Sequence, residues 1–156
     1  MTGAIDRFLE SARVHGIGPD VRRFPEGTKT ARAAADAIGS EVGQIVKSLV
    51  FMADDRAIMA FTSGANRVDE SKLAAVVEAN DVRRATPEEA RAATGFAVGG
   101  TPPFGHPEPL TYVVDPALLS WDEIWAAAGT PDSVFRLTPA ELLRATGAVP
   151  AAFTHG

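Results

Sequence analysis

A ten-residue stretch from Val98 to Pro107 has the composition of a ligand-binding loop, because it holds three glycines and three prolines. Glycine lets backbone N–H groups approach a ligand closely, and proline keeps a loop in shape without a mobile side chain. A row of oriented amides can hold a carbonyl oxygen or an anion. The stretch is therefore a candidate site, although an ordinary turn between two elements would also account for its composition.

Lys47 is the second candidate, because it interrupts an apolar run over residues 45–51. Alternate side chains of a strand point to opposite faces, so Lys47 would share a face with Ile45 and Leu49. Lysine side chains are mostly exposed in proteins. The charge of Lys47 therefore lies either on a solvated strand edge or in a cleft, and the pattern leaves both options open.

Several common catalytic groups are missing from the sequence. The 156 residues include no cysteine, which rules out disulfides, a cysteine nucleophile and thiolate metal ligands. Neither a G-x-S-x-G nucleophile motif nor a P-loop occurs. The three histidines, His15, His106 and His155, are far apart and lack metal-ligand spacing. No metal site and no cofactor are expected.

The elements that must position these groups mix helices and strands. Helices are expected over residues 4–15, after N-caps at Thr30 and Asp69, and at capping boxes that begin at Thr86 and Thr138. Strands are expected over residues 20–24, 44–53, 56–62, 111–114 and 134–137. Residues 121–128 have helical spacing, but residues 122–128 also fit the first strand of a hairpin that turns at 129–132. Without strict alternation of the two types, the pattern predicts one α+β domain around a mixed sheet.

The net charge of −5 is unusual for a protein that grips long stretches of nucleic acid. Four basic residues nonetheless cluster, and they form either a local basic rim or a solvated face: Arg22, Arg23, Lys29 and Arg32. No apolar run approaches the roughly 20 residues of a membrane helix, and residues 1–10 lack the pattern of a signal peptide. A cytoplasmic protein with no membrane association is expected.

Two segments together resemble the YbaK-type editing-domain family, which includes inserted domains of prolyl-tRNA synthetase and free-standing proteins. Residues 44–51 match its I-V-K-[ST]-L strand, and Gly99, Pro103 and Gly105 match its G-x-x-x-P-x-G loop. Weaker matches are the helix start at Thr30, residues 67–69, and the closing hairpin and helix over 125–139. The resemblance extends over residues 20–146, within a single domain expected to span residues 1–156.

This resemblance implies a fold and a reaction. The fold would be a mixed, mostly antiparallel, barrel-like sheet with surrounding helices, in which residues 122–128 form a strand. The reaction would be hydrolysis, in trans, of the ester that joins a wrong amino acid to the 3′ end of tRNA. The expected substrate is tRNA for proline carrying alanine, cysteine, serine, threonine or 2-aminobutyrate. Because such an ester is already activated, water and the 2′-hydroxyl of the terminal adenosine would suffice, without a metal.

The resemblance also implies roles for individual residues and partners. Lys47 would pair with phosphate or ribose, and the glycine-rich loop would hold the carbonyl oxygen and the acyl group. The expected catalytic residues are Lys47, Gly99, Gly100, Pro103 and Gly105. The expected substrate-binding residues are Thr30, Thr101, Phe104 and His106. The acceptor end of tRNA is the expected partner, and prolyl-tRNA synthetase is a candidate second partner.

Two alternatives to an editing enzyme stay open. The first is a non-catalytic module of the same fold that binds tRNA without turnover. The second is a small-molecule-binding domain whose glycine-rich loop holds the phosphate of a nucleotide. A deacylation assay with mischarged tRNA separates the enzyme from both alternatives. The oligomeric state is not indicated by the sequence.

Overall fold

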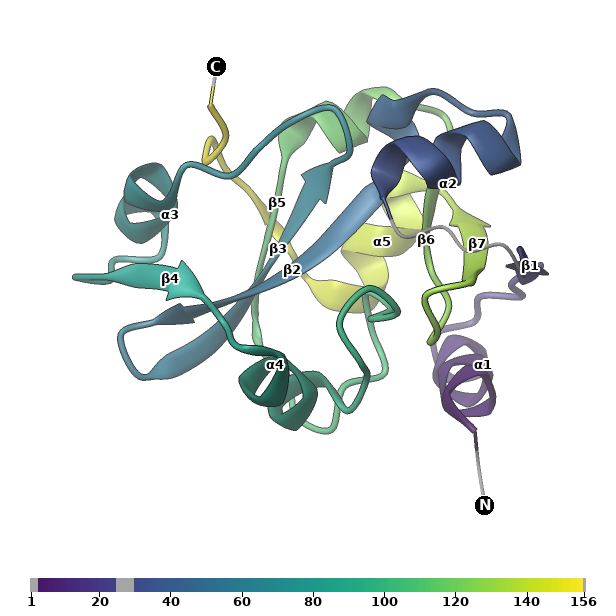
Figure 1. The fold of residues 1–156 in the computed structure, drawn as a ribbon, viewed down its shortest axis with the longest axis horizontal. Coiled ribbons are helices and arrows are strands. Elements are labelled where there is room, and N and C mark those ends of the chain that lie inside the picture. The colour runs from purple at the N-terminus through teal and green to yellow at the C-terminus, as the bar shows by residue number, and fades with distance from the viewer. Residues whose placement is uncertain (1–2, 25–29, 156) are drawn as a thin grey trace.

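The computed structural model describes residues 3–24 and 30–155. Within these ranges lie five α-helices: α1 (Ala4–Val14), α2 (Ala31–Ile38), α3 (Glu70–Val76), α4 (Pro87–Thr94) and α5 (Pro139–Thr146). Two short 3₁₀ helices are η1 (Val42–Gln44) and η2 (Pro116–Ser120). The strands are β1 (Arg22–Arg23), β2 (Val46–Ala53), β3 (Arg56–Ser63), β4 (Val82–Arg84), β5 (Thr111–Val114), β6 (Ile124–Ala127), β7 (Ser133–Leu137) and β8 (Val149–Pro150). The expected single α+β domain is confirmed (Figure 1).

The strands form two open sheets. Five strands make one sheet in the order β4-β2-β3-β5-β8, in which β3, β5 and β8 run parallel and β4, β2 and β3 run antiparallel. The smaller sheet has the order β1-β7-β6 and is antiparallel. The expectation of a barrel-like sheet is therefore wrong for the described residues. Within the described residues, the backbones of the two sheets are joined by an isolated bridge between Ile45 and Trp125. On its outer edge, β2 pairs with β4 over residues 51–53.

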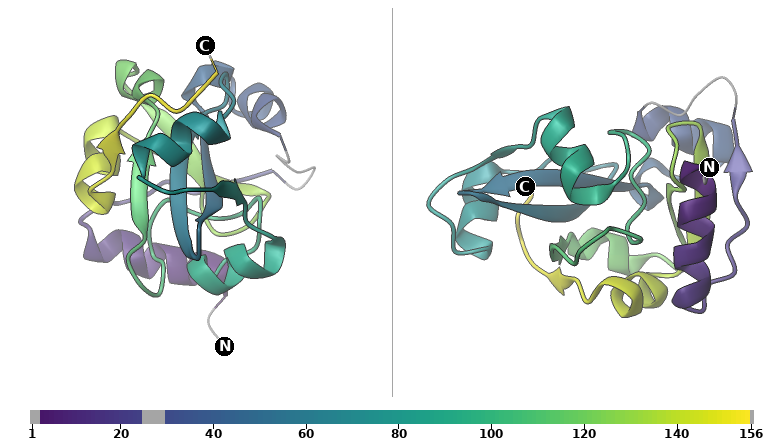
Figure 2. Two further views of the ribbon diagram at one scale, coloured as in Figure 1. Left: turned by 90° about the vertical axis from the view of Figure 1, so that its left-hand side faces the viewer. Right: turned by 90° about the horizontal axis from the view of Figure 1, so that it is seen from below.

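The large sheet separates two apolar clusters. On one face, Leu73 and Val77 from α3 and its C-cap pack with Phe51 and Phe153. The other face is covered by α1, α5, η2 and the smaller sheet, whose buried side chains form the larger cluster. A third cluster joins α2 to Trp125 and Val134. In Figure 2, α1 and β1 lie at one end of the molecule, and the β2–β3 hairpin extends toward the other.

Local sequence signals account for the helix starts and the hairpin. Thr86 and Thr138 each accept a hydrogen bond from the third helical residue, whose glutamate side chain in turn accepts one from the N-cap amide. Both expected capping boxes are therefore confirmed. Residues 124–127 form a strand, as the resemblance implied, and pair with β7 across the expected turn. None of the helices over the described ranges has the length and apolarity required to cross a bilayer.

Phe104 belongs to the core, although it was expected to bind substrate. The residue is 3% exposed, and its ring stacks on that of Phe8 at 5.5 Å between centroids. The ring of Phe135 lies 5.9 Å away on another side. The Phe104 side chain packs against Phe8 of α1 and Phe135 of β7 and does not line the cleft described below. Substitution at position 104 is therefore expected to change core packing.

Phe104→Ala should lower the free energy of unfolding by about 3–5 kcal/mol, which is the usual cost of removing a buried phenylalanine ring. Urea denaturation of the wild type and the variant measures this change. Val14→Ala is a suitable control, because Val14 is 75% exposed on α1 and its loss should change stability by less than about 0.5 kcal/mol. Equal stability of Phe104→Ala and the wild type would contradict the core position of the ring.

Candidate active site

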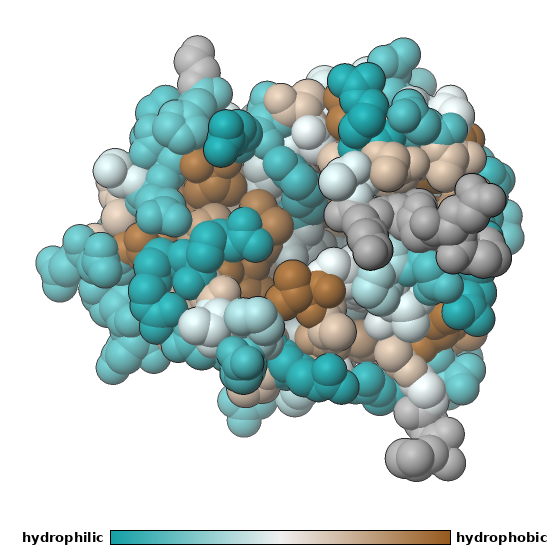
Figure 3. All heavy atoms as spheres, viewed as in Figure 1, coloured by the Kyte–Doolittle hydropathy of each residue, from teal (hydrophilic) through white to brown (hydrophobic). Residues whose placement is uncertain are grey.

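A cleft of about 1000 Å³ lies between the two sheets, beside the half of β2 that β4 leaves unpaired. Its walls come from β2, α2, the β4–α4 connection, the loop over residues 98–101 and the β6–β7 hairpin. Many of the lining residues are small, including Ala31, Ala34, Ala126 and Ala127. In the space-filling view this face is hollowed near its centre, where apolar side chains gather (Figure 3). A nucleoside-sized ligand fits a cleft of this volume.

Lys47 lines the cleft, and its ammonium group is held in place by the chain that follows β3. The Nζ atom donates a hydrogen bond to the backbone oxygen of Asn66 at 2.6 Å. The side-chain amide of Asn66 donates to Oδ2 of Asp115 at 2.9 Å. Asp115 is 2% exposed and also accepts from the backbone amides of Ser63 and Ala117. A buried carboxylate thus fixes the loop that orients Lys47.

The environment of Lys47 disfavours its charge on balance. Burial lowers the pKa of the Lys47 ammonium, and the nearby guanidinium groups of Arg67 and Arg84 lower it further. The carboxylate of Asp115 acts in the opposite direction. A cation held among other cations is stabilised by an anionic or carbonyl ligand, because that ligand supplies the countercharge that the protein lacks. Of the two options left open by the sequence, the structure favours the cleft, because Lys47 lines it. That Lys47 binds a ligand there stays a prediction.

Only part of the glycine- and proline-rich loop reaches the cleft. Among the described residues, Val98, Gly99 and Thr101 line it, whereas Gly100 and Pro103 are buried behind it. The amide of Gly100 already donates to the backbone oxygen of Ala97 at 3.1 Å, and proline has no amide hydrogen. The loop residues that can meet a ligand are thus Val98, Gly99 and Thr101.

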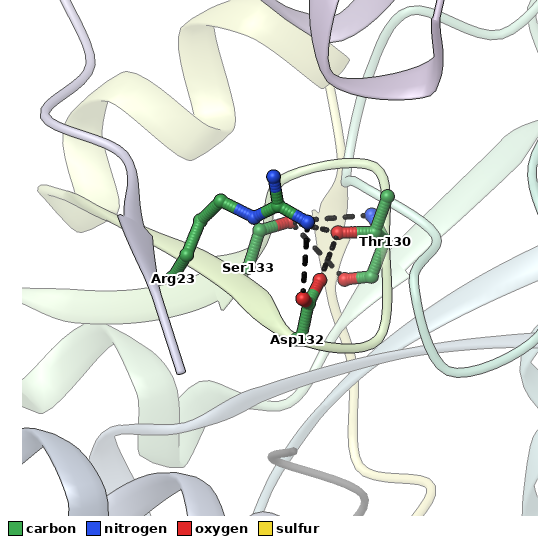
Figure 4. A network of polar contacts seen from close by, with 4 residues as sticks. All are labelled: Arg23, Thr130, Asp132 and Ser133. Carbon is green, nitrogen blue, oxygen red and sulfur yellow. Dashed lines mark hydrogen bonds and ion pairs between the residues drawn. The ribbon is translucent and has the colours of Figure 1, made fainter. Parts of the chain in front are cut away.

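A network of polar contacts links four residues at the β6–β7 turn and β1 (Figure 4). Oγ1 of Thr130 donates to Oδ1 of Asp132 at 2.6 Å and lies 2.7 Å from Oγ of Ser133. Arg23 from β1 binds Oδ2 of Asp132 at 3.1 Å. The Thr130 hydroxyl and the Arg23 guanidinium both lower the pKa of Asp132. A Cβ on Gly100 would lie 2.6 Å from the backbone carbon of Thr130, so the loop packs directly on the turn.

His106 anchors the far end of the loop to β5, outside the cleft lining. Its Nε2 lies 2.9 Å from the oxygen of Pro102, which can only accept, so Nε2 carries the hydrogen. Nδ1 then accepts from the hydroxyl of Tyr112 at 2.6 Å. Burial lowers the pKa of His106, which favours this neutral form. Gly105 is exposed at a φ of 89° and packs against Ser11, so it too contributes to the shape of the loop.

The remaining expected residues lie at the rim of the cleft or away from it. Thr30 lines the cleft at the start of α2, where its hydroxyl accepts from the amide of Ala33. Within the basic group, Arg32 lines the cleft, Arg22 lies over the ring of Trp125 at 4.9 Å, and Arg23 is paired with Asp132. Lys29 lies outside the described residues.

Two polar groups of the cleft were not expected from the sequence. Oγ of Ser48 is buried and lacks a hydrogen-bond partner among the described residues. Arg84 reaches the cleft from β4, a strand of three residues whose pattern is too short to predict. Ser48 carried a signal, since it follows Lys47 in the strand motif, but nothing local marked Arg84. The described residues also contain no cluster of three or more potential metal ligands.

The depressed pKa of His106 predicts a pH dependence of stability. Below the usual histidine pKa of 6.5, the unfolded chain binds a proton that the folded protein binds less readily. The free energy of unfolding should therefore fall as the pH drops from 6.5 toward the lower pKa of the folded state. Urea titrations at about pH 7.5 and about pH 5.5 should show that the wild type loses more stability than His106→Gln, which cannot titrate. An equal loss in both proteins would contradict this assignment.

Comparison with known proteins places the chain in a family. Residues 25–145 match the model of the aminoacyl-tRNA editing domain. The protein YwhH of Bacillus subtilis, which is uncharacterized, is 31% identical over 139 residues, or 86% of this chain and 88% of that protein. A segment of the proline–tRNA ligase of Geobacillus sp. is 33% identical over 59% of this chain, but the match spans only 16% of the ligase.

A solved structure extends the likeness over the full length. The protein in that crystal structure is described provisionally as a trans-editing enzyme for prolyl-tRNA synthetase, and it is 46% identical to the present chain. The match covers 100% of the present chain and 99% of the solved one, with a TM-score of 0.93. The family resemblance that the Lys47 strand and the glycine-rich loop indicated is thereby confirmed. The chain belongs to the aminoacyl-tRNA editing domain family.

Proposed function

We propose that this protein hydrolyses the ester bond of mischarged aminoacyl-tRNA, acting in trans on tRNA that a synthetase has released. The observation that carries the proposal is the position of Lys47, whose ammonium is fixed by Asn66 at a cleft that the loop residues Gly99 and Thr101 also line. Membership in the editing-domain family and the likeness to a provisional trans-editing enzyme support the same reaction.

Hydrolysis of an aminoacyl ester does not require a protein nucleophile, because the ester is already activated. Positioning of the ester and stabilisation of the developing oxyanion supply most of the rate in such reactions. In the proposed mechanism the amides of Gly99 and Thr101 bind the carbonyl oxygen, and Lys47 binds the 3′ end of the tRNA. Water attacks with help from the 2′-hydroxyl of the terminal adenosine, and no metal takes part.

The polar groups of the cleft favour a ligand with hydrogen-bonding capacity. Buried polar atoms are usually paired, so the unpaired Oγ of Ser48 points to a ligand that completes its hydrogen bond. The ribose and the amino group of an aminoacyl-adenosine both offer such a partner. The proposed acyl groups are small, namely alanine, cysteine, serine, threonine and 2-aminobutyrate. The acceptor end of tRNA for proline is the proposed partner, with prolyl-tRNA synthetase as a candidate second partner and the cytoplasm as the place of action.

A panel of charged tRNAs tests this function. Alanyl, cysteinyl, seryl, threonyl and 2-aminobutyryl esters of tRNA for proline should be deacylated at different rates, with at least one far faster than the spontaneous reaction. Correctly charged prolyl-tRNA should be spared, since editing requires discrimination that an apolar synthetase site cannot supply alone. Equal hydrolysis of prolyl-tRNA and all other forms would overturn the editing function, and tight binding without any turnover would favour the non-catalytic module.

Lys47→Ala should reduce the single-turnover rate about 10- to 100-fold, because it removes a charge-assisted contact worth roughly 1.5–3 kcal/mol. Its melting temperature should remain close to that of the wild type, since the side chain is only half-buried and leaves no apolar cavity. Lys72→Ala is the matched control, because Lys72 is an exposed lysine on α3 that contacts the backbone of Thr154. A folded Lys47→Ala protein with wild-type turnover would remove Lys47 from the mechanism.

A further inference from the structure

A second, smaller hollow of about 190 Å³ adjoins the cleft across β2. It is bordered by residues of β2, β4 and the start of α3: Lys47, Leu49, Phe51, Arg67, Val68, Glu70 and Arg84. Three of these residues, Lys47, Leu49 and Arg84, also line the cleft. The two depressions therefore adjoin at these three side chains, and a ligand that extends past Lys47 would contact both.

The strand register explains why three cations meet here. Phe51 of β2 stands opposite Arg84 of β4, so these two side chains lie on the same face of the sheet. By alternation, Lys47 and Leu49 share that face with Phe51. The guanidinium of Arg84 lies 5.5 Å from the centroid of the Phe51 ring, which holds it over the sheet. Arg67 completes the group from the segment that leads into α3.

The positive charge of this hollow is left largely unneutralised by the protein. Neither Arg67 nor Arg84 forms an ion pair with a carboxylate within the described ranges, and Glu70 is the single acidic residue of the lining. Arg83, the neighbour of Arg84 on the opposite face, is instead bound by both oxygens of Glu89 at 2.8 Å. Repulsion from Arg67 and Arg84 contributes to the lowered pKa of Lys47. An anion in the hollow would relieve this repulsion.

We infer that the hollow formed by Lys47, Arg67 and Arg84 binds a backbone phosphodiester of the tRNA 3′ strand. This inference rests on the proposed function and adds to it the path that the tRNA 3′ strand takes across the protein. With the terminal nucleoside in the cleft, the strand crosses β2 at Lys47, and the phosphate on the 5′ side of that nucleoside meets Arg67 and Arg84. The phosphate of a polynucleotide, and not the acyl group alone, then selects tRNA over free amino-acid esters.

The first measurement compares two small substrates that differ by one phosphodiester. One is the 3′-aminoacyl ester of adenosine, and the other is the same ester of the dinucleotide CpA. The wild type should have the higher kcat/KM for the CpA ester. In Arg67→Ala and in Arg84→Ala, the ratio of the two kcat/KM values should fall about tenfold, as for the loss of one charge-assisted hydrogen bond.

Arg83→Gln is the matched control for these variants. It removes the same unit of charge from the same strand, but from the face that Glu89 occupies. The ratio of kcat/KM values should change less than about twofold in this variant, because a screened surface charge contributes little. A loss in Arg83→Gln equal to the loss in Arg84→Ala would show a general effect of net charge and overturn the assigned site.

Binding of uncharged CpCpA tests the site without any hydrolysis. Titration calorimetry of the wild type should show binding that weakens with salt, and Arg67→Ala and Arg84→Ala should each lower the slope of log K against log salt by about 0.7, as for one lost contact to a single strand. If the wild type does not bind CpCpA, or if the variants bind it as the wild type does, the phosphate site is wrong. Binding that depends on both arginines together with no deacylation of any ester would uphold this site and overturn the proposed reaction alone.

Discussion

The buried carboxylate of Asp115 ties together the parts of the structure on which the candidate site depends. It accepts hydrogen bonds from the amide at the end of β3, from the amide of Ala117 in η2, and from the side chain of Asn66. A carboxylate can be buried only when its oxygens are hydrogen-bonded, since an unpaired buried charge is very costly. The end of β3, η2 and the loop that holds Asn66 therefore keep their relative positions. Because β3 pairs with β5, which leads to Asp115, and Asn66 accepts the hydrogen bond of Lys47, this pairing also sets the position of the Lys47 ammonium.

The two faces of β2 carry different kinds of side chain at the candidate site. Val46, Ser48 and Val50 share one face, and the two valines belong to the larger apolar cluster. Lys47, Leu49 and Phe51 share the other face, beside Arg84. Because β4 pairs only with residues 51–53, the first half of the strand is open to the cleft along one edge. The strand thus carries an apolar support and an unpaired hydroxyl on one face and a cation on the other, and all of them border the cleft at its open edge.

The sequence predicted those features that depend on neighbours along the chain. The capping boxes at Thr86 and Thr138 need only a threonine and a glutamate three residues apart, so their helix starts were predictable. The strand around Trp125 contradicts its helical spacing, and its pairing with β7 overrides that preference. Here the family resemblance, and not the periodicity of the segment, predicted the right element.

The orientation of the glycine- and proline-rich loop could not be predicted, because it depends on residues far away in the sequence. Phe104 turns inward to the rings of Phe8 and Phe135, and His106 turns to Tyr112. Only Val98, Gly99 and Thr101 are left facing the cleft. Composition marked the loop as unusual, but it could not tell the residues that line the cleft from those that hold the loop in shape. The same limit applies to Arg84, whose short strand is defined only by its pairing with β2.

The contact between Gly100 and Thr130 has a consequence for how this site can evolve. Since no room exists for a Cβ at Gly100, the loop and the hairpin turn cannot accept substitutions independently at that contact. A larger residue at position 100 would require a compensating shift of the whole turn, which the hydrogen bonds among Thr130, Asp132 and Ser133 resist. Substitutions are accommodated more easily at exposed cleft positions such as Val98, which is 50% exposed and takes no part in that contact.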